Sequence, residues 1–74
     1  MTVTIKLFAS LRAGRFDARS LTLPAPVRVS DAKAAAKVPC REAAVILVNS
    51  RHAALDHSLA DGDTLALFPL VGGG

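Results

Sequence analysis

Apolar and polar positions alternate along the first residues of the chain. Val3, Ile5 and Leu7 are apolar, and the residues between them are Thr or Lys. A period of two is typical of a strand with one buried face, so the pattern predicts a strand over residues 2–8. Residues 20–23 alternate in the same way and are followed by two prolines, which predicts a second strand that pairs with the first as an antiparallel hairpin.

The next segment has the composition of a helix. Ser30 can accept hydrogen bonds from free backbone N–H groups, and Asp31 suits the positive end of a helix. The alanines and lysines of residues 32–37 favour helix, and Pro39 stops it. These signals predict a helix of about two turns, which must depend on packing for its stability.

The second half of the chain reads as further strands. Residues 44–48 are continuously apolar, which is typical of a strand covered on both sides. Residues 51–55 read as a short edge strand, and Leu59 is expected to fill the core. Residues 64–68 alternate again and predict the final strand.

This order of elements predicts an α+β domain, with one short helix packed across one face of a mixed sheet of four to five strands. If the last strand lies parallel to the first, the arrangement is the β-grasp, or ubiquitin-like, fold. We assign residues 1–68 to this domain and residues 69–74 to a flexible tail. The expected centre of the core consists of Val3, Ile5, Leu7, Leu21, Leu23, Val45, Leu47, Leu65 and Leu67.

The chain ends in an apolar run followed by three glycines. Consecutive glycines make a thin backbone that can enter a narrow channel. Pro69 lacks an N–H donor and tends to release the chain from a sheet. Phe68, Leu70 and Val71 are too apolar for a segment that stays in water, and they indicate docking against a partner. The α-carboxylate of Gly74 is then the distinctive group, although a frayed terminus would also be glycine-rich.

Composition and charge narrow the classes of partner. The net charge is +3, and all nine Lys and Arg lie within residues 1–53. The arginines are scattered and there is no Trp or Tyr, which argues against nucleic-acid binding. A solvated basic face, or a surface that meets an acidic partner, fits better. No segment approaches the ~20 apolar residues of a membrane helix, and a lone cysteine with no visible signal sequence favours the cytoplasm.

Single reactive residues have structural explanations. Cys40 has no second thiol or metal set around it in the sequence, so packing is its expected role. His52 and His57 lack a ligand cluster, and we expect no metal. His57 is expected to order the turn from Asp56 to Asp61 through hydrogen bonds. Asp61 and Asp63 flank a glycine and read as turn formers rather than paired catalytic carboxylates. No glycine-rich loop joins a strand to a helix, so bound ATP is not expected.

A set of ordered motifs carries a family resemblance. The motifs are Leu7-Phe8-Ala9-Ser10-Leu11-Arg12, Val48-Asn49, Leu55-Asp56-His57, Leu59-Ala60-Asp61-Gly62-Asp63 and Phe68-Pro69-Leu70-Val71-Gly72-Gly73-Gly74. Together they resemble the MoaD/ThiS family of sulfur carriers, most closely its molybdopterin synthase small subunits. Two departures are Leu70, where the family usually has a second proline, and Gly72, which occupies the variable position before the diglycine.

The resemblance implies a mechanism at the terminal carboxylate. A ubiquitin-activating-like adenylyltransferase would use ATP to adenylate Gly74, and sulfide or a persulfide would then displace AMP to leave a thiocarboxylate. The large catalytic subunit of molybdopterin synthase would take the sulfur for the molybdopterin dithiolene. The resemblance implies that Gly73 keeps the reacting end thin and that the preceding residues dock it: Phe68, Pro69, Leu70, Val71 and Gly72. The chain itself would bind no cofactor and have no active site.

The C-terminal segment is also compatible with other functions. One is a carrier for another pathway, such as thiamine thiazole formation, whose carriers generally lack the Phe-Pro pair. Another is a ubiquitin-like modifier joined to lysines. A third is a non-catalytic β-grasp interaction module, in which the terminal glycines would be incidental.

Overall fold

The computed structural model describes residues 1–12, 14–38 and 43–69. Its strands and helices follow the predicted order, with two additional short strands. The elements are β1 (Thr2–Leu7), the 3-10 helix η1 (Ala9–Arg12), β2 (Ala18–Thr22), β3 (Val27–Arg28), α1 (Val29–Ala35), β4 (Ala43–Val48), β5 (Arg51–His52), β6 (Ser58–Leu59) and β7 (Thr64–Pro69).

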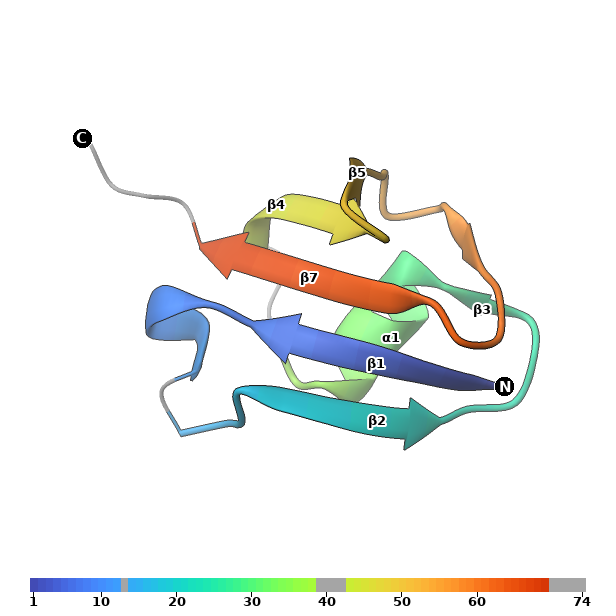
Figure 1. Cartoon of the computed structure of the whole chain (residues 1–74), viewed down its shortest axis with the longest axis horizontal. Helices are drawn as coiled ribbons and strands as arrows, with labels where there is room; N and C mark the ends of the chain where they lie inside the picture. Colours follow the sequence, from blue (N-terminus) through green and yellow to red (C-terminus); the bar gives the residue numbers. More distant parts are fainter. Residues whose placement is uncertain (13, 39–42, 70–74) are drawn as a thin grey trace.

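Five of the strands form one mixed sheet in the order β2-β1-β7-β4-β5, and α1 lies across one face of it (Figure 1). β1 pairs antiparallel with β2, as predicted, and parallel with β7, which meets the condition set for the β-grasp arrangement. β7 in turn pairs antiparallel with β4, so it is the central strand. A hairpin, a crossing helix and a parallel pairing of the first and last long strands define the β-grasp fold, which confirms the predicted class.

The hydrophobic core lies between the sheet and α1. Ile5, Leu65 and Leu67 are completely buried, and Val29 and Ala32 come from the helix to meet them. Burying each large aliphatic side chain stabilises the fold by about 1.5–3 kcal/mol, so a domain of this size depends on few of them. Five members of the expected centre are fully buried and two more, Leu21 and Leu23, pack at its rim; the buried five are Val3, Ile5, Leu7, Leu65 and Leu67.

The remaining two members of the expected centre were placed wrongly. The run over residues 44–48 was expected to be covered on both sides, but Val45 is 36% exposed and Leu47 is only half-buried. The register explains this, because Val45 lies opposite Phe68 and Leu47 opposite Ala66, on the sheet face away from α1. A helix of seven residues covers one side of the sheet, and β4 therefore has an open face.

The helix begins earlier than predicted. Arg28, rather than Ser30, is the N-cap residue, and the carboxylate of Asp31 accepts a hydrogen bond from the Arg28 N–H at 2.9 Å. The N–H groups of Val29 and Ser30 donate to the main-chain carbonyls of His57 and Leu55, at 3.0 and 2.9 Å. Because the backbone before β6 satisfies these first donors, a serine cap is unnecessary. The predicted stop, Pro39, lies outside the described residues, and α1 ends at Ala35.

The turn before β7 forms as predicted and is held by both aspartates. Asp61 accepts a hydrogen bond from the Thr2 N–H at 2.7 Å, which joins the turn to the start of β1. Asp63 accepts from the Ala60 N–H at 2.8 Å and from the side-chain amide of Asn49 at 2.9 Å. His57 was expected to order the turn from Asp56 to Asp61 through hydrogen bonds; its main-chain N–H donates to the carbonyl of Ala54, and its carbonyl accepts from the Val29 N–H.

The short strands β3 and β6 pair antiparallel and set Val27 opposite Leu59. Both side chains are buried, so Leu59 fills the core as predicted. None of the helices formed by the described residues is long and apolar enough to cross a bilayer.

Candidate functional site

The strand that leads to the C-terminal segment occupies the middle of the sheet. β7 ends at Pro69 beside η1, at the opposite end of the sheet from the N-terminus (Figure 1). Pro69 is the last residue of β7, one position beyond the expected domain boundary, and pairs with Ala43 across an irregular register. A proline suits the last position of a strand, because it has no N–H to donate to the ladder.

Two aromatic rings stack at this end of the sheet. The centroids of the Phe8 and Phe68 rings are 4.3 Å apart, with 11° between their planes. Phe8 follows β1, and its N–H donates to the carbonyl of Leu67 at 3.2 Å, which extends the parallel pairing by one residue. Lys6 and Ala66 are paired two residues earlier, so Phe8 and Phe68 stand on the same open face as that pair.

Val45 completes an apolar surface around the stack. It lies opposite Phe68 on β4 and is 36% exposed, while Phe8 is 37% exposed. We call Phe8, Val45 and Phe68 the aromatic patch. Next to it the small side chains of Thr64 and Ala66 leave a hollow of about 520 Å³ on the open face. An exposed apolar surface beside a strand end is characteristic of protein docking sites.

The polar groups near the hollow are structural or cationic. Lys6 and Asn49 line the hollow, and Asn49 also accepts a hydrogen bond from the Thr64 N–H at 3.0 Å. The Ala60 N–H, followed by the amide of Asn49, holds the pKa of the Asp63 carboxyl below its ordinary value. Within residues 1–12, 14–38 and 43–69, no three His, Cys, Asp or Glu side chains are grouped so that they could hold a metal ion.

The structure places only part of the predicted site. Phe68 lies in the aromatic patch and Pro69 ends β7. The other predicted site residues lie outside the described residues, as does Cys40; they are Leu70, Val71, Gly72, Gly73 and Gly74.

Sequence reasoning missed Phe8 and Val45. Phe8 continues the outward-pointing positions of the first strand, so the alternation could have predicted that its side chain lies on the outer face of the sheet. The face on which Val45 lies could not be predicted in this way, because residues 44–48 are apolar throughout and show no alternation.

The fold and the patch together define a ubiquitin-like protein of the β-grasp class. In structure the chain is similar to the small archaeal modifier protein SAMP1 of Haloferax volcanii, with a TM-score of 0.79, 27% identity and complete coverage of both chains. It is also similar to a putative molybdopterin converting factor subunit 1 of Pyrococcus furiosus, with a TM-score of 0.73 and 32% identity over 96% of this chain and 99% of that one.

A further similar structure is the complex of subunits 1 and 2 of the molybdopterin-converting factor of Helicobacter pylori 26695. It has a TM-score of 0.69 over the full length of both chains, and at 20% identity it supports the fold alone. No curated protein sequence matches the chain. The sequence profile of the ThiS family matches residues 5–74, nearly the whole chain. The protein therefore belongs to the ThiS family of ubiquitin-like sulfur carriers, which are carriers without catalytic activity of their own.

Proposed function

We propose that this protein carries sulfur as a thiocarboxylate on Gly74 and donates it for the dithiolene of molybdopterin. The observation that carries the proposal is the position of the aromatic patch at the end of β7, five residues before the terminal carboxylate. A partner that binds Phe8, Val45 and Phe68 holds the root of the C-terminal segment. The glycines that follow are thin enough to enter an active site in that partner.

The chemistry needs activation by another protein, because a carboxylate is a poor electrophile. The Gly74 carboxylate attacks the α-phosphate of ATP on an adenylyltransferase, which gives an acyl-adenylate and pyrophosphate. Sulfide, or a persulfide followed by reduction with a thiol, displaces AMP and forms the thiocarboxylate. The thiocarboxylate sulfur then attacks the pterin precursor on the large subunit of molybdopterin synthase, and hydrolysis returns the carboxylate. A dithiolene contains two sulfurs, so two loaded carriers are used for each product.

Two features favour the molybdopterin branch over thiamine thiazole formation. Phe68 and Pro69 form the pair that thiamine-type carriers generally lack. The chain is also 32% identical to the putative molybdopterin converting factor subunit of Pyrococcus furiosus. Stacking with Phe8 gives Phe68 a defined orientation at the docking surface, which supports a specific role for the pair.

The first test is the intact mass of the protein after incubation with ATP, a sulfide source and an activating enzyme that is active on its own carrier. We expect a gain equal to the replacement of one oxygen by sulfur, and no gain when Gly74 is deleted. An unchanged mass with a demonstrably active enzyme that forms a complex with the chain would contradict the sulfur-carrier proposal. Addition of the large subunit and the pterin precursor to the loaded protein then tests for the dithiolene.

Variants of the patch separate docking from chemistry. Phe8→Ala should slow thiocarboxylate formation by about tenfold or more at limiting carrier, because an aromatic anchor at a docking surface contributes strongly to binding. Leu55→Ala is the matched control, since Leu55 is equally exposed at 39% but lies outside the patch. Equal rates for the two variants would show that the aromatic patch is not part of the docking surface. The proposal that Gly74 carries the sulfur would be unaffected.

A protein modifier is the second candidate, because the likeness to the small archaeal modifier protein SAMP1 extends over both whole chains. The same acyl-adenylate would then react with a lysine ε-amine to form an isopeptide bond. Tagged protein isolated from cells under denaturing conditions would carry adducts that mass spectrometry identifies as lysine linked to Gly74. Such adducts, together with failure to supply the dithiolene, would favour the modifier.

A further inference from the structure

A second hollow lies away from the aromatic patch, between the segment before β2 and the last turn of α1. Its volume is about 370 Å³, and its walls come from residues 14–16, Arg19 and residues 35–37. None of its described lining residues also lines the hollow beside the patch. The two hollows can therefore be occupied independently.

The walls of this second hollow are joined by Arg15. Its Nε donates to the carbonyl of Lys37 at 3.2 Å, and its Nη1 donates to the carbonyl of Leu11 at 3.1 Å. The guanidinium thus connects η1 to the segment that follows α1. Lys37 has a φ of 60° and Gly14 a φ of 69°, so both walls turn sharply at the rim. The hydrogen bond from Arg15 to Lys37 links the two walls of the hollow.

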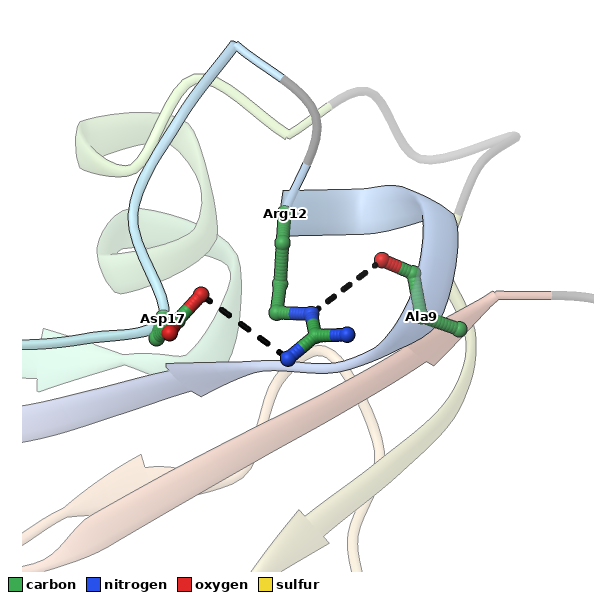
Figure 2. A network of polar contacts seen from close by, with 3 residues as sticks. All are labelled: Ala9, Arg12 and Asp17. Carbon is green, nitrogen blue, oxygen red and sulfur yellow. Dashed lines mark hydrogen bonds and ion pairs between the residues drawn. The ribbon is translucent and has the colours of Figure 1, made fainter.

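The charged side chains among the described residues that line the hollow are all positive. Arg15, Arg19 and Lys37 line it, and no Asp or Glu is among its described lining residues. The nearest acidic residue in the sequence, Asp17, turns toward Arg12, with 3.9 Å between Asp17 Oδ1 and Arg12 Nη1 (Figure 2). Three cations around one hollow raise the potential there and attract anions.

The lining also restricts which anion is bound. The guanidinium carbon of Arg19 lies 4.6 Å from the centroid of the Phe16 ring, and Phe16 packs against the core. A nucleobase would have to displace Arg19 in order to stack on this ring. The other apolar lining consists of alanine side chains, which offer little surface to an organic ligand. Carboxylates of a protein need no such surface, because charge and hydrogen bonds hold them.

We propose that this basic hollow, formed by Arg19 and Lys37 on the frame that Arg15 provides, binds an acidic segment of a partner protein. The complementary charge is that of consecutive Asp or Glu side chains, which can reach both exposed cations at once. The docking is additional to the aromatic patch and does not depend on the sulfur chemistry of Gly74. It gives the carrier a second recognition surface, which is basic, whereas the aromatic patch is apolar.

The test uses the full ¹⁵N-labelled chain titrated with hexaglutamate, followed by heteronuclear NMR at low ionic strength. Amide shifts should concentrate in residues 14–19 and 35–37. The double variant Arg19→Gln/Lys37→Gln should weaken binding by roughly fourfold to twenty-five-fold, because each exposed ion pair contributes about twofold to fivefold. Arg19→Lys keeps the charge and should bind within about twofold of the parent.

The matched control removes the same net charge elsewhere. Arg28→Gln/Arg51→Gln changes two exposed arginines that do not line the hollow, and it should retain the parent affinity within about twofold. Equal weakening in both double variants, or shifts spread over the whole chain, would show diffuse attraction and overturn the proposal. Inorganic phosphate that shifts the same amides with the same affinity would also overturn it, because the hollow would then be a simple anion site.

Discussion

The stack of Phe8 on Phe68 makes a quantitative prediction about the open face of the sheet. Phe8 is 37% exposed, so about two thirds of its surface is buried. Phe8→Ala removes the packing contacts that the buried part of the ring makes. A fully buried large apolar side chain contributes about 1.5–3 kcal/mol, and the partial burial of Phe8 lowers this to about 1–2 kcal/mol. The rings lie 4.3 Å apart and nearly parallel, which adds a pair energy of about 0.5–1.5 kcal/mol.

A double-mutant cycle isolates that pair energy. The parent, Phe8→Ala, Phe68→Ala and the double variant are unfolded in urea and followed by far-UV circular dichroism, because the chain has no Trp or Tyr for fluorescence. The double variant should be less destabilised than the sum of the single variants by the pair energy. Each kcal/mol lowers the melting temperature of a domain this small by about 4–8 °C, so thermal unfolding gives a second reading.

The control cycle pairs Phe68→Ala with Leu55→Ala. Leu55 is as exposed as Phe8 but has no ring contact with Phe68, so these two changes should add. If the Phe8–Phe68 coupling is no larger than in this control, about 0.3 kcal/mol or less, the rings do not stack in solution. Phe8 would then not orient Phe68 for docking.

Three further predictions concern the fold that supports the site. Leu65→Ala should cost about 2–5 kcal/mol in free energy of unfolding, because Leu65 is completely buried on the central strand; a loss below 1 kcal/mol in urea unfolding would contradict the packing described. Gly62→Ala should cost about 1–2 kcal/mol through backbone strain alone, since Gly62 has a φ of 88° and its added Cβ meets open space, and Gly62→Asn should cost less. Asp63→Asn should make the free energy of unfolding less dependent on pH in the acid range. The folded pKa of Asp63 lies below its ordinary 3.8, so the carboxylate stabilises the fold above that value, and the contribution is lost as the pH falls through the folded pKa. Unfolding free energies from pH 2 to 7 should therefore differ most between parent and variant near neutral pH; parallel curves would refute the assignment.

The central position of β7 connects stability with the proposed function. β7 is held by β1 on one side and β4 on the other, so tension on the C-terminal segment is borne by two ladders of hydrogen bonds. A partner can therefore pull the last residues into an active site without opening the domain. An edge strand, held on one side only, would peel more easily.

Much of this organisation follows from local sequence. Alternation over residues 2–8 and 64–68 identified both long strands that flank the site, because side chains of a strand point to opposite faces in turn. Asp61 and Asp63 predicted the turn before β7. The carboxylate of Asp63 accepts the nearby N–H of Ala60, whereas that of Asp61 accepts the N–H of Thr2, which is distant in sequence. The apolar run before the terminal glycines predicted a docking segment at the C-terminal end, of which only Phe68 and Pro69 are among the described residues.

Other features were decided by the tertiary structure alone. Alternation tells which residues share a face but not which face is covered, and an apolar run such as residues 44–48 gives no alternation at all. The short α1 covers one face of the sheet, and the register between β4 and β7 places Val45 on the opposite, exposed face. The start of the helix was likewise set by carbonyls that lie more than twenty residues away in sequence. Local pattern fixed the elements of this protein, whereas the exposed surface beside its C-terminal segment was fixed by long-range pairing, because burial depends on what lies opposite each strand.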